Sequence, residues 1–204
     1  EIHGPVNRKN KDFPRCRRGF DHEFGFRVGV FFGSEFLPES DRYRNMRRLI
    51  SVSTGCFYKL GVSKEEIFGR LKAWVIDGVE VPFNKPQDVF DFEISEDNSD
   101  FLRSLSFVTI HAPDNDLENP AAIEVLNRLD HIYRLIYAKN IVFHVRKDDD
   151  LSIFFNYGFK ASMENDDWRK EKETNTVPSI ERLLRIYPRL GFVLDVGHAD
   201  SVDP

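Results

Sequence analysis

The chain has 204 residues, of which 41% are hydrophobic and 31% are charged, and these values suit one soluble globular domain with a substantial core. Its net charge of −5 argues against a protein that binds nucleic acid through its overall charge. Two cysteines, Cys16 and Cys56, are too few for a disulfide framework, which excludes the small disulfide-stabilised class.

Long apolar segments are absent from the sequence. There is no apolar run of about 18 residues or more, so we predict no membrane span and no membrane partner. The N-terminal segment lacks the apolar stretch of a signal peptide. We therefore expect a cytoplasmic protein whose cysteines are reduced.

Residues 1–48 contain two segments typical of strands and one typical of a helix. Glu1–His3 resembles the end of a strand, Phe26–Phe32 has the composition of a strand, and Glu39–Arg48 indicates a short helix. Between the two strand segments lies a basic stretch that includes Arg17 and Arg18. Because clustered guanidinium groups bind phosphate well, we expect Arg17 and Arg18 to contact a substrate phosphate; the alternative is a solvated basic loop.

From residue 50 onward, short apolar runs alternate with longer amphipathic segments. Helices are predicted after the cap residue Ser63, after Pro120 and from Pro178. Nearly continuous apolar strands that alternate with helices indicate a parallel sheet covered by helices. The predicted strands are Ile50–Ser53, Gly78–Val81, Phe107–His111, Asn140–His144, Lys160–Glu164 and Gly191–Asp195.

Six strand–helix units suit either an open doubly wound sheet or most of an eight-stranded barrel. The sequence contains no GxGxxG after the first of these strands and no GxxxxGK[ST], so a nucleotide-binding open sheet loses its usual support. We predict a single α/β domain over residues 1–204 with a (β/α)8 TIM-barrel fold. In this prediction residues 50–204 supply strands one to six and residues 1–48 supply strands seven and eight, a circularly permuted order. The alternative is an N-terminal extension on a barrel that is incomplete.

Titratable side chains end four of the predicted strands: His111, His144, Glu164 and Asp195. The carboxyl ends of barrel strands meet at one rim, where active sites lie. Imidazole nitrogens and carboxylate oxygens that meet there suit a divalent metal. A single histidine in such a place is usually structural, but four titratable groups on four strands favour a functional site because burying them unpaired is costly.

Two further residues are candidates for the same rim. His198 lies three residues after Asp195, and we expect Gly197 to turn the backbone sharply so that His198 faces the rim. His198 would then be a metal ligand or a substrate contact, or else a loop histidine packed on a neighbour. Glu80, in the strand Gly78–Val81, is a candidate substrate contact; the alternative is an ion pair with a lysine or arginine.

Four segments together resemble the xylose isomerase-like TIM barrels: Val108–Pro113, Ile141–His144, Ser162–Asn165 and Leu194–Ala199. That superfamily includes sugar and sugar-phosphate isomerases and epimerases, and apurinic-site nucleases of the endonuclease IV type. The resemblance covers about residues 50–204. It implies a (β/α)8 barrel that binds a divalent metal ion, without distinguishing zinc, manganese, magnesium or cobalt.

The resemblance implies that Glu164 and Asp195 are metal ligands and that Glu164 also takes part in catalysis. The nuclease branch of the superfamily further implies His111, His144 and His198 as ligands, and His111 is an additional candidate for a substrate contact.

In residues 1–48, His3 matches a histidine of the seventh strand, and Asp21 with His22 resemble metal ligands of the loop that follows. The sequence departs from the family twice. No glutamate ends the predicted eighth strand, and Asp21 and His22 are adjacent where the nuclease branch has Asp-x-His.

The sequence leaves three functions open. The first is a metal-dependent isomerase or epimerase that acts on a sugar or sugar phosphate, with Glu164 moving a proton and His198 or His111 orienting the substrate. The second is metal-assisted cleavage of abasic DNA, against which the acidic composition and the absent glutamate count. The third is a degenerate barrel that binds a ligand or partner without turnover.

Overall fold

The computed structural model describes residues 30–31, 49–114, 116–117, 119–146, 149–166, 174 and 176–200. These residues contain a seven-stranded sheet with the order β1-β7-β6-β5-β4-β3-β2. Strands β2 to β7 are parallel, and each pairs with the next along the chain. The strands are β1 (Val30–Phe31), β2 (Ser51–Ser53), β3 (Gly78–Pro82), β4 (Phe107–His111), β5 (Asn140–Phe143), β6 (Ala161–Glu164) and β7 (Gly191–Leu194).

The positions of the parallel strands confirm the sequence-based prediction. Each of the six lies within one residue of its predicted bounds, and β4 matches at both ends. They are short runs, several of them rich in Val, Ile and Phe, and their flanks break the pattern. Local composition was therefore sufficient to predict where these strands lie.

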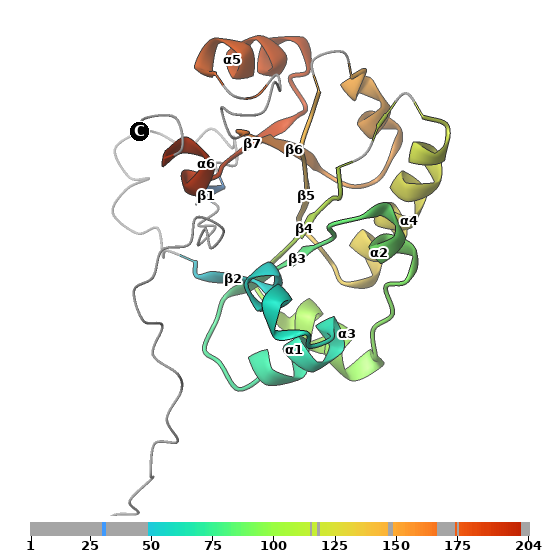
Figure 1. The fold of residues 1–204 in the computed structure, drawn as a ribbon, viewed down its shortest axis with the longest axis vertical. Coiled ribbons are helices and arrows are strands. Elements are labelled where there is room, and N and C mark those ends of the chain that lie inside the picture. The colour runs from blue at the N-terminus through green and yellow to red at the C-terminus, as the bar shows by residue number, and fades with distance from the viewer. Residues whose placement is uncertain are drawn as a thin grey trace, which may run out of the picture.

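The helices of the described region lie mainly on the convex side of a curled sheet (Figure 1). The predicted cap Ser63 is confirmed, since its side chain accepts a hydrogen bond from the Glu66 amide. No helix in the described part of the chain is long and apolar enough to cross a membrane. The helices are α1 (Lys64–Leu71), α2 (Pro86–Phe90), α3 (Glu96–Ser104), α4 (Ala121–Leu135), α5 (Val177–Ile186) and α6 (Val196–Asp200), with 3-10 helices η1 (Thr54–Leu60) and η2 (Leu151–Asn156).

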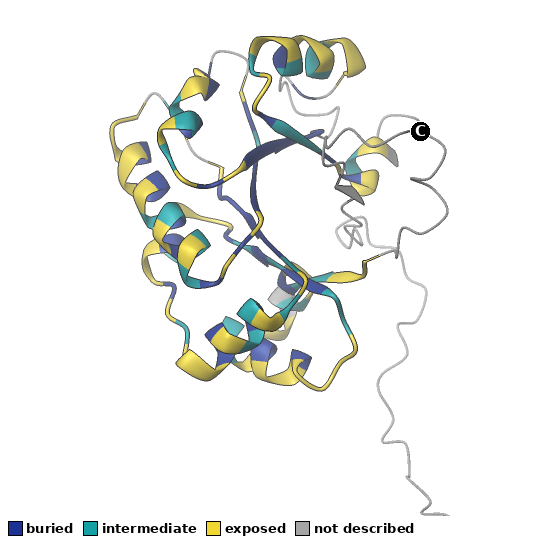
Figure 2. Ribbon diagram, turned by 180° about the vertical axis from the view of Figure 1, so that it is seen from behind, coloured by how far each residue is buried: buried dark blue, intermediate teal, exposed yellow. Residues whose placement is uncertain are grey.

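The hydrophobic core lies between the sheet and these outer helices. Val81 on β3 and Ile110 on β4 are fully buried there, together with Phe68 of α1 and Leu126 of α4. Buried residues line the sheet and the inner helix faces, whereas the outer helix faces are exposed (Figure 2). Because side chains alternate along a strand, the neighbours of these core residues lie on the concave face, and many of those neighbours are polar.

The sheet corresponds to part of a barrel. β1 pairs antiparallel with β7, with Val30 opposite Leu194, whereas strands of a (β/α)8 barrel are parallel and the expected order placed Phe26–Phe32 beside the first strand. The unpaired edge of a strand accepts any extended segment in either direction, which explains this difference. The described residues are compatible with an incomplete TIM barrel, and the rest of residues 1–48 lies outside them.

Candidate metal centre

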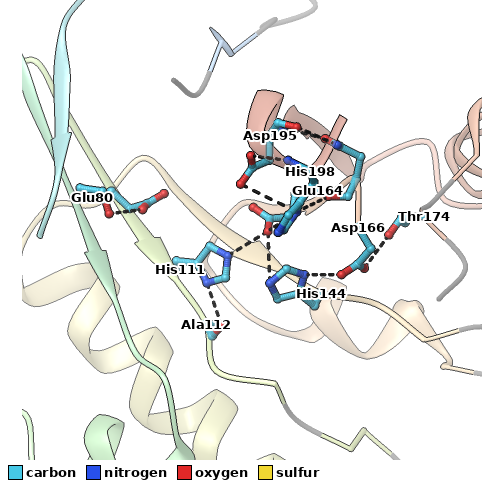
Figure 3. Close-up of polar contacts among 11 residues, drawn as sticks. Glu80, His111, Ala112, His144, Glu164, Asp166, Thr174, Asp195 and His198 are labelled. Atoms are coloured by element: carbon cyan, nitrogen blue, oxygen red, sulfur yellow. Dashed lines mark hydrogen bonds and ion pairs between the residues drawn. The ribbon is translucent and has the colours of Figure 1, made fainter. Parts of the chain in front are cut away.

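The carboxyl ends of four neighbouring parallel strands bring the predicted strand-end residues together. His111 is the last residue of β4 and Glu164 the last of β6, while His144 and Asp195 directly follow β5 and β7. His198 joins them from α6. Figure 3 shows these five side chains pointing toward one another. The parallel topology is the reason that residues up to 87 positions apart in sequence, from His111 to His198, share one site.

Glu164 lies at the centre of this cluster. Its Oε1 atom is 3.2 Å from Nε2 of His111, 3.1 Å from Nε2 of His144 and 3.7 Å from Nδ1 of His198. The Glu164 side chain is only 2% exposed. A carboxylate buried to this extent requires a positive charge or strong hydrogen bonds nearby, and protonated histidines or a bound cation would supply that charge.

Oxygen atoms on the far side of two imidazole rings indicate which nitrogen faces Glu164 as an acceptor. Nδ1 of His144 is 3.0 Å from Oδ1 of Asp166, and Nδ1 of His111 is 3.1 Å from the carbonyl oxygen of Ala112. A carboxylate or carbonyl oxygen has no proton to offer, so in neutral rings these neighbours favour the proton on Nδ1 and leave a lone pair on Nε2. A carboxylate or carbonyl behind a histidine is the usual support of a metal ligand.

The donor set therefore suits a divalent cation. Two Nε2 lone pairs that face one carboxylate oxygen repel it unless a cation lies among them. Ligand atoms that share a tetrahedral zinc ion at about 2.0–2.1 Å are about 3.3 Å apart. The distances of 3.1 and 3.2 Å between Oε1 of Glu164 and the two Nε2 atoms are close to that separation.

Glu164 belongs to two groups of candidate ligands. His111, His144 and Glu164 form one group, and Glu164, Asp195 and His198 form the other; within each, the ligand atoms lie within 4.8 Å of one another. Both groups are buried or nearly so. Among the described residues the cluster thus offers ligands for one cation or for two that share Glu164.

Asn165 connects the ends of β6 and β7 and fixes the second group. Its side-chain amide donates to the carbonyl of Asp195 over 2.8 Å and accepts from the Asp195 amide over 2.6 Å. Its backbone carbonyl accepts a hydrogen bond from Nδ1 of His198 at 2.8 Å. These bonds hold Asp195 and His198 in one geometry.

The expectation of a sharp turn at Gly197 is wrong, because Gly197 lies within helix α6. The side chain of Asp195 accepts a hydrogen bond from the His198 amide at 3.1 Å, the arrangement of a helix cap. One turn of helix, and not glycine flexibility, places His198 near the cluster.

The other predicted site residues are not part of the described cluster around Glu164. Glu80 lies on the same side of the sheet but apart from the cluster (Figure 3), and its carboxylate accepts a hydrogen bond from Ser53 at 2.6 Å. The remaining candidates lie outside the described residues: His3, Arg17, Arg18, Asp21 and His22.

Sequence reasoning missed Asp166, which is fully buried and contacts both His144 and the hydroxyl of Thr174. A signal was available. Asp166 follows Glu164 by two residues, the spacing that returns a side chain to the same face of an extended segment.

Replacing Asp166 by asparagine should weaken metal binding by about 10- to 100-fold, the usual effect of losing the group that orients a histidine ligand. Asparagine keeps the size of the side chain but removes the charge that favours the Nδ1 proton of His144. Zinc titration calorimetry would measure the change. An affinity equal to that of the wild type would show that Asp166 does not support His144 as a ligand.

The fold and the cluster define a TIM-barrel-like α/β domain with a candidate metal centre at the carboxyl ends of its strands. No protein-family model and no curated protein matches the sequence. A similar solved structure is that of the probable 3-DHS dehydratase AsbF, involved in petrobactin synthesis, from Bacillus anthracis.

The similarity to AsbF has a TM-score of 0.54 at 16% sequence identity and covers 72% of this chain and 62% of that one. The present chain thus spans less than two thirds of AsbF. At this level of identity the comparison shows a shared fold.

Proposed function

We propose that this chain is a metal-dependent enzyme that isomerises or epimerises a sugar or sugar phosphate. The observation that carries the proposal is the buried carboxylate of Glu164, which lies within 3.7 Å of nitrogens from three histidines at the carboxyl rim of the sheet. The net charge of −5 favours a small-molecule substrate over a polyanion such as DNA. The name of the similar structure, a probable dehydratase, is compatible with an enzymatic role for this fold.

The contacts support a role for each residue of the cluster. His111, His144 and Glu164 would hold a divalent cation, whose charge would polarise a substrate carbonyl and the hydroxyl beside it. A carboxylate of the cluster, Glu164 or Asp195, accepts the proton from one carbon and returns it to the neighbouring carbon. His198 is the most exposed of the three histidines, with 20% of its side chain accessible. Because its Nδ1 donates to the Asn165 carbonyl, its Nε2 accepts a hydrogen bond from a substrate hydroxyl and so orients the substrate.

A second candidate is metal-assisted cleavage of a phosphodiester, as at an abasic site in DNA. The specific observation in its favour is that Glu164 belongs to both candidate ligand groups. Cations that share a ligand in this way stabilise the attacking and leaving oxygens of phosphodiester cleavage. The acidic composition and the missing eighth-strand glutamate count against it.

One experiment separates the two candidates. Protein treated with chelator, and the same protein reloaded with zinc, manganese, magnesium or cobalt, is incubated in heavy water with a panel of aldoses, ketoses and their phosphates. Metal-loaded protein should exchange a carbon-bound proton of a substrate for deuterium, which NMR detects, and chelated protein should not. The same samples are tested for nicking of a duplex with an abasic site. Nicking without exchange would support the second candidate, and equal exchange with and without metal would refute the proposal.

A further inference from the structure

A row of polar side chains crosses the concave face of the sheet, one layer toward the amino ends of the strands from His111. The strand register aligns Ser53 with Glu80, Glu80 with Thr109 and Thr109 with Asn140. On the next strand the hydroxyl of Ser162 donates a hydrogen bond to Oδ1 of Asn140 at 3.0 Å. The interior of a TIM barrel is usually filled with branched apolar side chains, so packing alone does not account for this row.

Glu80 retains hydrogen-bonding capacity within the row. One of its carboxylate oxygens accepts the Ser53 hydroxyl at 2.6 Å, and its backbone carbonyl accepts the Thr54 hydroxyl at 3.2 Å. No lysine or arginine of the described region forms an ion pair with it, in contrast to the alternative considered from the sequence. A carboxylate has about four acceptor positions, and Glu80 is only partly buried, so it can accept hydrogen bonds from a ligand.

Asn140 supplies the opposite hydrogen-bonding role. It is 5% exposed, and its Nδ2 donor has no hydrogen-bond partner among the described residues. Its orientation is fixed by Ser162, and Gly191 leaves the space that Ser162 needs, because a Cβ atom at Gly191 would lie 2.2 Å from the Ser162 hydroxyl oxygen. A buried donor without a partner is costly in a folded protein, and a bound ligand would remove that cost.

We propose that Glu80 and Asn140 position the hydroxyl groups of a polyhydroxylated substrate along the concave face. Their strands lie two positions apart in the sheet, so their backbones are separated by about 9–10 Å. A hydroxyl group both donates and accepts, so a carbon chain with several hydroxyls can donate to Glu80 and accept from Asn140. Its reacting end then lies at Glu164, and this part of the inference rests on the proposed function.

The test uses xylitol, a linear polyol with five hydroxyls, and pentane-1,5-diol, which has the same carbon chain without the inner hydroxyls. Binding of each to the metal-loaded full chain is measured by calorimetry or ligand-observed NMR. Glu80→Gln should weaken xylitol binding about tenfold or more, the effect of losing a hydrogen bond to a charged group, and Ser53→Ala and Asn140→Ala should each weaken it less. Glu124→Gln, on the exposed face of α4, makes the same charge change and should leave binding unchanged.

The ratio of the two affinities distinguishes positioning from a structural role. Glu80→Gln should reduce the preference for xylitol over the diol, whereas a variant that only loosens the fold would weaken both ligands equally. An unchanged preference in Glu80→Gln, or a wild-type protein that does not bind xylitol, would overturn the inference. If xylitol binding depends on Glu80 but no metal-dependent proton exchange is found, the inference stands and the proposed function fails.

Discussion

Replacing Glu164 by glutamine is expected to lower the affinity for divalent metal by more than about 100-fold, beyond the effect of losing an orienting residue, and to abolish turnover. Glutamine has nearly the same shape, but it removes the anionic oxygen that lies 3.1–3.2 Å from both His111 and His144. Glu164 belongs to both candidate ligand groups, so a cation bound at either group would lose a ligand. Elemental analysis after dialysis measures the metal content, and zinc titration measures the affinity.

The matched control for this variant is Glu124→Gln, which should keep full metal content. A Glu164→Gln protein that folds and binds zinc as the wild type does would contradict the assignment of Glu164 as the shared ligand.

Metal loading itself should stabilise the fold. A cation at about 1,000 times its dissociation constant adds about 4 kcal/mol to the free energy of unfolding, which for a chain of this size corresponds to a rise in melting temperature of about 8–16 °C. An imidazole binds a metal only in its neutral form, so the stabilisation by metal should decrease as the pH is lowered. Differential scanning calorimetry with and without zinc, at neutral and acidic pH, measures both effects.

The Glu164→Gln variant is the control for this stabilisation and should show no rise with zinc. The same rise in both proteins would mean that zinc stabilises the fold from another site. No rise in the wild type at saturating zinc would mean that the cluster holds its charge through protonated histidines instead.

Much of the fold was predictable because its strands are locally encoded. Most of the parallel strands are short apolar runs, and four strands end in or directly precede a titratable residue, as β4 does at His111. Helix α2 was missed because its five residues are too few to show an apolar period, and α3 because its nine residues are mostly polar. Their start signals, Pro86 and the cap Ser95, are common outside helices as well.

The pairing of β1 shows where local sequence stops being informative. The composition of Phe26–Phe32 indicated a strand, and Val30–Phe31 is one, but composition does not specify the partner or the direction of pairing. The antiparallel contact with β7 therefore could not be predicted from the segment itself.

The candidate site was predictable to the extent that topology determines it. The parallel order of the strands places His111, His144, Glu164 and Asp195 at one rim, whatever the paths of the loops. The contacts that orient them could not be predicted, because the Asp166–His144 ion pair and the hydrogen bonds of Asn165 depend on how the chain continues after β6. Gly197 illustrates the same limit, since the cap at Asp195 continues the chain as a helix.

The cluster around Glu164 is expected to bind a divalent metal. An anomalous difference map from crystals of the full chain grown with zinc tests it most directly. The structure predicts a peak bonded to Nε2 of His111, Nε2 of His144 and Oε1 of Glu164, with Asp195 and His198 beside it. At saturating zinc, a map with no peak at these atoms, and with the histidines hydrogen-bonded directly to Glu164, would contradict the claim.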